Sequence, residues 1–210
     1  MDKKIILALP VYNEERLLES SVVKLCDYIK DNVHLDCKII IVNNGSTDKT
    51  KEIGNSLANR YLNVEVIHLD VKGRGNALKN VWSNYKADVY SYCDIDLATD
   101  ITYLNELFNQ ILKGNNLVVA SRYSTGAISK RTIKRWIASV VYIFLVKLFF
   151  KTKISDFQCG FKAIDGRVVK EVLPMVLDNG WFFDTELILL TEKAGNYKIK
   201  EIPIKWKEMR

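Results

Sequence analysis

The chain has 210 residues, of which 48% are hydrophobic and 27% are charged. This length is enough for one domain with a full core, and the composition is that of an ordinary globular protein. The net charge of +6 suits an anionic partner such as a nucleotide, a phospholipid surface or a nucleic acid, but does not choose among them.

The four cysteines argue against a zinc site or a disulfide framework, because they lie far apart and form no CxxC pair. They are Cys26, Cys37, Cys93 and Cys159. We expect buried thiols in a reducing compartment. The N-terminal apolar run is too short for a signal peptide and acidic residues follow it, so the sequence predicts no secretion signal.

Apolar runs alternate with helical periodicity through the first 121 residues. We expect strands at 4–10, 37–42, 64–69, 88–93 and 116–121. We expect helices at 14–31, from the turn at 43–48 to about residue 60, at 73–85, and from about residue 99 to 113. Ser46 or Thr47 would cap the second helix, and Thr99 or Asp100 the fourth. This order of elements predicts a parallel, doubly wound α/β sheet.

Five residues fall at the carboxyl ends of the expected strands. They are Pro10, Asn43, Asn44, Asp94 and Asp96. In open α/β sheets ligands bind just beyond these strand ends, so the sequence predicts a ligand site there. Two aspartates one residue apart can turn toward one cation, and their oxygens suit Mg²⁺ or Mn²⁺ bound to substrate phosphates. A solvated loop is the alternative interpretation of the acidic pair.

The alternation stops after residue 122, and residues 129–153 are basic, then apolar, then basic again. The apolar part, 136–150, is shorter than the ~20 residues of a spanning helix and contains Lys147. Its apolar positions cover nearly the whole circumference of a helix. We interpret it as a buried helix or dimer contact, or as a helix lying in a membrane interface with basic residues at its ends. A true span is the least favoured interpretation.

Several sequence motifs resemble known glycosyltransferases. LPVYNEE (9–15), VNNGSTDKT (42–50), KGRGNAL (72–78), DIDLATD (94–100) and SRY (121–123) together resemble family 2 glycosyltransferases with the GT-A fold. DFQCGFKAI (156–164), WFFDTELILL (181–190) and IKEIPIKW (199–206) resemble a narrower group, the polyprenyl-phosphate (dolichyl-phosphate) hexose synthases. The resemblance implies a single catalytic domain, 1–210, with a Rossmann-like, doubly wound mixed sheet and helices on both faces.

The resemblance implies a donor site at the strand ends. Pro10, Tyr12, Glu14 and Asn44 would line the nucleotide pocket. Asn44 stands where the family usually has an aspartate, since this chain reads NNGS in place of DDGS. The amide keeps the hydrogen-bonding shape but loses the charge, so base selectivity could differ.

The resemblance also implies a catalytic metal site for Mg²⁺ or Mn²⁺. Asp94 and Asp96 would be catalytic and would hold the ion, with Asp96 as the direct ligand and Asp94 nearer the ribose or sugar. Arg122 would be a catalytic residue that faces the donor phosphates.

On the acceptor side, Arg131 and Arg135 would approach the acceptor phosphate. Gln158 and Asp184 would shape the sugar and acceptor pocket, together with the catalytic residues Asp156 and Glu186.

Several of these features also have a purely structural interpretation. Gly73 opens the GRG sequence (73–75), which suits either a phosphate-binding turn or a tight turn. The sequence at 43–45 is also an ordinary turn sequence. The two arginines Arg131 and Arg135 also suit a solvated helix end, and Asp156 suits a turn cap.

The predicted reaction is the inverting transfer of a hexose from UDP-glucose or GDP-mannose to a polyprenyl or dolichyl phosphate. QCGFK, WFFDTE and IPIKW resemble the dolichyl-phosphate glucose branch, which uses UDP-glucose, slightly more than the mannose branch. The acceptor phosphate is largely ionised at neutral pH, so alignment and electrostatics suffice without a histidine base.

The expected partners are the nucleotide sugar, the lipid phosphate and a membrane surface, without nucleic acid. We expect a cytoplasmic, peripherally membrane-associated protein, either a peripheral single-domain form or an excised catalytic domain. Transfer to a soluble saccharide or protein, and a non-catalytic nucleotide-sugar-binding module, remain as alternatives.

Overall fold

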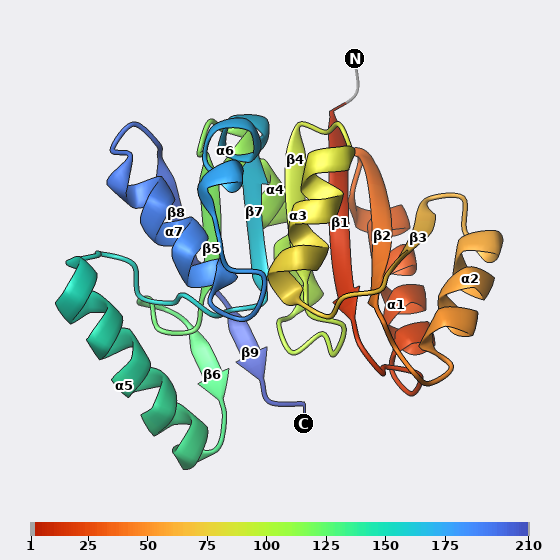
Figure 1. Cartoon of the computed structure of the whole chain (residues 1–210), viewed down its shortest axis with the longest axis horizontal. Helices are drawn as coiled ribbons and strands as arrows, with labels where there is room; N and C mark the ends of the chain where they lie inside the picture. The colour runs from red at the N-terminus through yellow and green to blue at the C-terminus, as the bar shows by residue number, and fades with distance from the viewer. Residues whose placement is uncertain (1–2, 210) are drawn as a thin grey trace.

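A seven-stranded sheet forms the centre of the protein, in the order β3-β2-β1-β4-β7-β5-β8 (Figure 1). The computed structural model describes residues 3–209. The strands are β1 (Lys4–Val11), β2 (Asp36–Asn44), β3 (Val64–Leu69), β4 (Val89–Cys93), β5 (Leu117–Ser121), β7 (Phe161–Asp165) and β8 (Ile199–Pro203). All neighbours pair in parallel except β7, which is antiparallel to both β4 and β5. The sheet is therefore mixed, as the family resemblance implied, and the parallel sheet expected from the alternating pattern is wrong at β7.

Helices cover both faces of the sheet (Figure 1). One face carries α1 (Leu18–Asn32), α2 (Thr50–Arg60) and α4 (Leu104–Leu112), with the short turn η1 (Ile101–Tyr103) before α4. The other face carries α3 (Arg74–Asn84), α6 (Gly166–Glu171) and α7 (Phe183–Lys193), with the short turn η2 (Leu173–Met175) after α6. This confirms the doubly wound arrangement.

Side-chain alternation along β1 explains why the sheet is buried on both sides. Ile5, Leu7 and Leu9 belong to the core beneath the first group of helices, while Ile6 and Ala8 belong to the core beneath the second. A strand with apolar residues on both faces suits the centre of such a sheet. The apolar run at the start of the chain therefore forms an internal strand of the sheet, between β2 and β4.

The predicted helix caps are partly correct. Asp100 caps η1, because its carboxylate accepts a hydrogen bond from the backbone N–H of Thr102 at 3.0 Å. Neither Ser46 nor Thr47 caps α2, which begins at Thr50, where the Asp48 carboxylate accepts from the Thr50 N–H at 3.0 Å. That prediction is wrong because the turn after β2 is longer than its sequence indicated.

The four cysteines are buried free thiols, as the sequence predicted. Burial is the main reason that the pKa of Cys37 rises to about 12 and that of Cys26 to about 11. The thiols therefore stay protonated at neutral pH.

Two of the strands after β5 form a second, two-stranded sheet. The strands β6 (Ile128–Lys130) and β9 (Lys205–Lys207) pair in parallel, and α5 (Ile133–Phe150) follows β6. Figure 1 shows α5 standing apart from the two helical layers, beside β6.

The side chains of α5 are mostly exposed, and only Val146 is buried on this helix. Ile133 is 76% exposed, Phe144 62% and Phe149 74%. A helix buried within its own chain is therefore the wrong interpretation, whereas a contact between copies and a membrane-interface helix both remain. Among residues 3–209, no helix has the length and hydropathy needed to cross a membrane.

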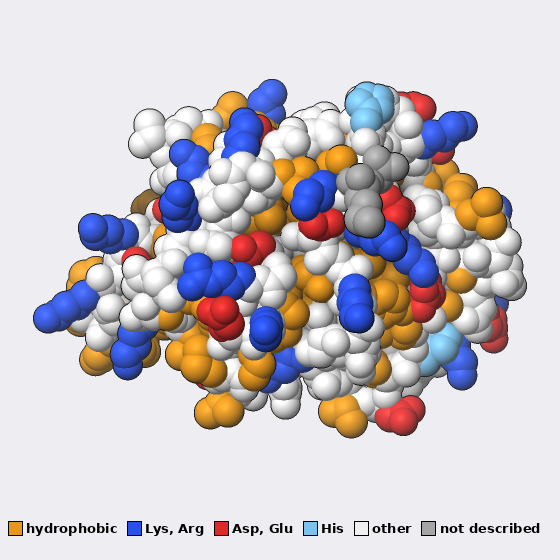
Figure 2. Space-filling view, turned by 90° about the horizontal axis from the view of Figure 1, so that it is seen from above, with side chains coloured by type: hydrophobic (Ala, Val, Ile, Leu, Met, Phe, Trp, Pro, Cys, Tyr) orange, Lys and Arg blue, Asp and Glu red, His pale blue; other side chains and the backbone are white. Residues whose placement is uncertain are grey.

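The surface at the amino ends of β1 and β2 has a different character. Figure 2 shows this face, on which basic and acidic side chains are interspersed. The exposed surface of α5, in contrast, is mostly apolar.

Candidate functional site

A cleft of about 540 Å³ opens at the carboxyl ends of β1, β2 and β4. It is lined by Pro10, Val11, Tyr12, Glu14, Asn44, Lys72, Gly73, Arg74, Asp94, Ile95, Asp96, Gly180 and Trp181. Its volume is within the range of small-molecule sites. The structure brings together seven of the predicted site residues here, from four separate segments of the chain: Pro10, Tyr12, Glu14, Asn44, Gly73, Asp94 and Asp96.

The neighbouring asparagines of β2 do different things. Asn43 is tied to the protein, since its side chain bonds the His68 ring at 3.2 Å and accepts from the Ser46 N–H at 3.1 Å. Asn44 lines the cleft and is only 4% exposed, yet its Oδ1 has no hydrogen-bond partner within residues 3–209. A buried amide oxygen without a partner is costly, so Asn44 is suited to accept a hydrogen bond from a ligand.

Asp94 and Asp96 follow β4 directly and both face the cleft. The Asp96 carboxylate accepts from the Ala98 N–H at 3.2 Å, which orients the loop. The Asp94 side chain lines the cleft and keeps 39% of its surface exposed. Desolvation raises the pKa of Asp94 above its ordinary value, opposed by Arg74 and reinforced by Asp96.

Arg74 is a site residue that the sequence interpretation missed. Its guanidinium forms an ion pair with Asp94, lies 3.4 Å from the Asp184 carboxylate, and stacks 4.2 Å from the Trp181 ring. The signal was present in the GRG sequence, where only the glycines were considered. Arg74 places a fixed positive charge beside the acidic pair.

Asp184 lies beneath the cleft rather than in it. It is fully buried, and its carboxylate accepts from the Lys162 Nζ at 2.9 Å and from the Tyr92 hydroxyl. Lys162 is also fully buried. The sequence placed Asp184 in the sugar and acceptor pocket; in the structure it is absent from the cleft lining and lies 3.4 Å from the Arg74 guanidinium.

The glycines of the GRG sequence allow the loop before α7, residues 176–182, to approach α3 closely. A Cβ atom at Gly73 would collide with the Asn179 carbonyl, and one at Gly75 would lie 2.8 Å from the Asp178 carbonyl. The N–H groups of Gly75 and Asn76 donate to the carbonyls of this loop at 3.3 and 3.1 Å. These amides are therefore occupied, and the structure favours the tight-turn interpretation over a phosphate-binding turn.

Glu186 holds the same loop in place. Its carboxylate accepts from the backbone N–H groups of Leu177 and Asp178 at 3.0 and 2.8 Å. It is absent from the residues that line the cleft. Its position favours a structural role over the catalytic role predicted from the sequence.

A second group of residues lies on the other side of Asp94. Asp156 is 1% exposed and binds Arg122 through two side-chain hydrogen bonds of 2.7 and 2.8 Å and one from the Arg122 backbone N–H at 3.0 Å. Asp156 therefore fixes the direction of the Arg122 guanidinium. Gln158 is exposed beside this pair.

Arg131 lies close to Arg122 but forms no salt bridge with a carboxylate of residues 3–209. Its Nη1 donates to the Ser139 hydroxyl at 3.1 Å, and its Nη2 is buried without a partner among the described residues. Desolvation lowers the pKa of Arg131, and the charge of Arg122 lowers it further. This guanidinium is therefore placed to bind an anion.

Arg135, in contrast, is 61% exposed and forms a 2.8 Å salt bridge with Glu208. The Glu208 carboxylate also accepts from the Thr132 N–H at the start of α5. The structure places Arg135 at a solvated helix end, away from Arg131's buried environment.

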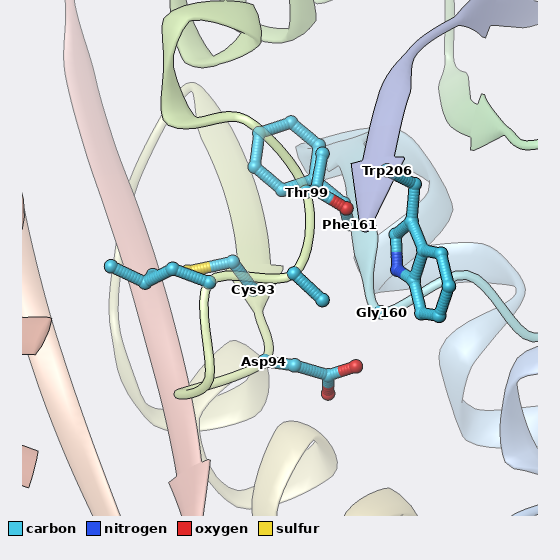
Figure 3. A pocket seen from close by; sticks show the side chains of 8 residues that line it. Cys93, Asp94, Thr99, Gly160, Phe161 and Trp206 are labelled. Atoms are coloured by element: carbon cyan, nitrogen blue, oxygen red, sulfur yellow. The ribbon is translucent and has the colours of Figure 1, made fainter. Parts of the chain in front are cut away.

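Figure 3 shows Asp94 and Trp206, whose ring stacks on Arg122 and Arg131. The Asp94 carboxylate and the Trp206 indole point toward one small hollow of about 10 Å³, beside Gly160 (Figure 3). The Asp94 N–H also donates to the Gly160 carbonyl at 3.0 Å. A Cβ atom at Gly160 would collide with the Asp94 carboxylate, so only glycine leaves room for this arrangement.

The acidic pair fits a hard divalent cation. Within residues 3–209 no group of three or more His, Cys, Asp or Glu side chains could hold a metal ion. Mg²⁺ and Mn²⁺ are often held by one or two carboxylates together with substrate phosphates and water. Two carboxylates at the floor of an open cleft satisfy that requirement.

The chain belongs to glycosyl transferase family 2, whose family model matches residues 7–173. It is 32% identical over 206 residues to the glycosyltransferase AglD of Haloferax volcanii, and 30% identical over 213 residues to the dolichyl-phosphate beta-glucosyltransferase ALG5A of Trichomonas vaginalis. Each match covers 97% of this chain. The chain spans 33% of the length of the first protein and 65% of the second.

Solved structures confirm the GT-A fold. The glucosyl-3-phosphoglycerate synthase of Mycobacterium tuberculosis in complex with UDP has a TM-score of 0.74 at 19% identity. The match covers 99% of this chain and 72% of that protein. A complex of the same synthase with Mn²⁺, UDP and glucosyl-3-phosphoglycerate has a TM-score of 0.71.

Substitution of Gly160 by alanine tests the construction of the acidic site. The new methyl group displaces the Asp94 carboxylate, so we expect Gly160→Ala to weaken Mn²⁺ binding in the presence of a nucleotide sugar by about tenfold or more. Gly166→Ala is the matched control, because no atom lies closer than 3.9 Å to its added Cβ. Calorimetric titration measures the affinity, and equal affinity in both variants and the parent contradicts the prediction.

Proposed function

We propose that the chain is an inverting, metal-dependent glycosyltransferase that moves a hexose from a nucleotide sugar to a polyprenyl phosphate. One observation carries the proposal: Asp94 of the cleft and Trp206 line the same small hollow, and the Trp206 ring stacks on the basic cluster formed by Arg122 and Arg131. A donor in the cleft and a phosphate at the arginines would then lie next to each other.

The donor is UDP-glucose in this proposal. Asn44 offers a buried neutral acceptor to an N–H of the base, and Lys72 lies 3.7 Å above the Tyr12 ring at the same cleft. The dolichyl-phosphate beta-glucosyltransferases among the relatives, and the UDP bound by the mycobacterial synthase, support a uridine nucleotide. Arg74 would add a charge-assisted hydrogen bond to the donor diphosphate.

Asp94 and Asp96 would hold Mn²⁺ or Mg²⁺. The ion supplies Lewis-acid neutralisation of the diphosphate as it leaves. The Mn²⁺ bound with UDP by the mycobacterial synthase supports the manganese form.

The acceptor phosphate would bind between Arg122 and Arg131. A phosphate monoester has a second pKa of about 6 and is mostly ionised at neutral pH, so it attacks without a base. Among the residues that the structure describes, no histidine lines the cleft. The residues of the chain therefore act by holding both substrates in line, and in-line attack inverts the anomeric configuration.

The position of α5 supports a lipid acceptor over a soluble one. Arg131 lies two residues before α5 and donates to Ser139 on that helix. A phosphate at Arg131 would thus sit at the base of an exposed apolar helix that could contact acyl chains. The basic residues around the helix suit anionic headgroups: Lys134, Arg135, Lys147, Lys151 and Lys153.

Donor choice and turnover test the proposed reaction. With Mn²⁺ present, we expect UDP-glucose to raise the melting temperature more than GDP-mannose does.

Asp96→Ala should abolish glucose transfer to a short-chain prenyl phosphate. Asp100→Ala lies in the same loop but outside the cleft lining, so this variant should retain glucose transfer. Its free energy of unfolding should fall by about 1 kcal/mol, because the cap of η1 is lost. Unchanged turnover in Asp96→Ala rules out the proposed mechanism.

Liposome flotation tests the role of α5. We expect the protein to float with anionic liposomes and the double variant Phe144→Ser/Phe149→Ser to lose at least tenfold in partitioning, since burying one such side chain contributes about 1.5–3 kcal/mol. Leu62→Ser removes a fully exposed apolar residue elsewhere and should float like the parent. A parent protein that stays with the aqueous fraction supports the soluble-acceptor alternative instead.

A further inference from the structure

Trp206 is the central residue of β9. This strand lies between the acidic loop, residues 94–100, and the basic cluster of Arg122 and Arg131. On one side of β9, the Trp206 backbone bridges to Thr99, and on the other it is in register with Ser129 of β6. The Asp100 N–H donates to the Lys205 carbonyl at 3.1 Å, and the Lys207 N–H donates to the Ala98 carbonyl at 2.9 Å. The loop after Asp96 and the strand before Arg131 are therefore both attached to β9.

The Trp206 side chain contacts both arginines. The indole ring centre lies 5.5 Å from the Arg122 guanidinium carbon and 4.9 Å from that of Arg131. The Tyr123 ring lies 5.9 and 5.1 Å from the same two atoms. Aromatic faces attract cations, so the two rings offset the repulsion between like charges.

This stabilisation matters because charge compensation at the cluster is incomplete. Among the described residues, Asp156 forms a salt bridge with Arg122, and none forms one with Arg131. Arg131 is held by hydrogen bonds to Ser129, Tyr123 and Ser139, but these neutral groups bring no negative charge, and its Nη2 has no partner among the described residues. Repulsion between the two like charges therefore remains to be offset.

The indole also faces the acidic side. It borders the hollow that contains Asp94, Gly160 and Thr99 (Figure 3). Trp206 is thus a single rigid side chain in contact with the arginines and adjacent to the acidic loop.

We propose that Trp206 is a positioning residue that sets Arg122 and Arg131 at a fixed place relative to the acidic pair, so that they bind a phosphate monoester. The inference rests on the proposed function, because it gives the arginines the acceptor phosphate as their ligand. A purely structural role is the competing explanation, since the ring also packs against the core. The two roles differ in what they predict for donor and acceptor affinity.

The experiment compares Trp206→Leu with Trp206→Phe. The first removes the aromatic face and the second keeps one. We expect Trp206→Leu to weaken binding of a soluble, short-chain prenyl phosphate by about tenfold, while Trp206→Phe retains most of the affinity. The affinity for UDP-glucose with Mn²⁺ should change less than twofold in both variants. Inorganic phosphate serves as a second probe and should show the same loss.

Trp181→Leu provides the opposite control, because Trp181 stacks on Arg74 in the donor cleft. It should weaken donor binding and leave prenyl phosphate binding unchanged. This double comparison separates a local effect at the arginines from general destabilisation. If Trp206→Leu does not fold, judged by circular dichroism, Trp206→Met replaces it.

The outcomes distinguish the inference from the function on which it rests. If the parent protein binds prenyl phosphate and Trp206→Leu binds it equally well, the positioning role is wrong and the acceptor site stands. Equal losses for donor and acceptor also overturn it, in favour of a structural role. A loss for prenyl phosphate but not for inorganic phosphate overturns it too, because the indole would then contact the prenyl chain. A parent protein that binds neither phosphate overturns the acceptor site and the inference together.

Discussion

The ion pair between Arg74 and Asp94 is the interaction on which the rest of the site depends. It is the last of three ion pairs that link a row of four side chains of alternating charge. From the core to the cleft, these side chains are Lys162, Asp184, Arg74 and Asp94. Buried charges are stable only when each has a partner, so every member of the row fixes the next. This row leaves a carboxylate partly exposed at the cleft floor, and Gly160 leaves the space it occupies. The arrangement explains how two neighbouring acids can be held at a strand end before any ligand neutralises them.

The site is divided by charge into two halves. The cleft side has Asp94 and Asp96 and suits a cation with a diphosphate, whereas the side of Arg122 and Arg131 suits an anion alone. β9 lies between them and bonds to the loop of one half and the strand of the other. Since α5 follows Arg131 almost directly, the exposed apolar surface of the chain begins where the anion would bind. In the proposed function, this order of elements gives the headgroup and the hydrocarbon of one lipid adjacent surfaces.

Local sequence patterns were sufficient to predict the five parallel strands, the buried thiols and the position of the acidic pair at the end of β4. These features depend on short-range periodicity or on residues that are adjacent in sequence. The strand β7 was missed because it follows an irregular segment and pairs antiparallel between strands that are distant in sequence. Arg74, Lys162 and Trp206 were not singled out, since their roles arise from contacts with residues 20 or more positions away, such as Asp94 for Arg74. Asp184 and Glu186 were expected to shape the sugar and acceptor pocket, and their partners, a buried lysine and a loop backbone, could be found only in three dimensions.

A crystal structure with Mn²⁺ and UDP-glucose tests the central claim most directly, because anomalous scattering locates manganese independently of the protein model. The account predicts one anomalous peak bonded to Asp96, with the diphosphate beside it and the uracil against Asn44. Nucleotide bound in the cleft without manganese at the acidic pair, or manganese bound elsewhere on the protein, would contradict it.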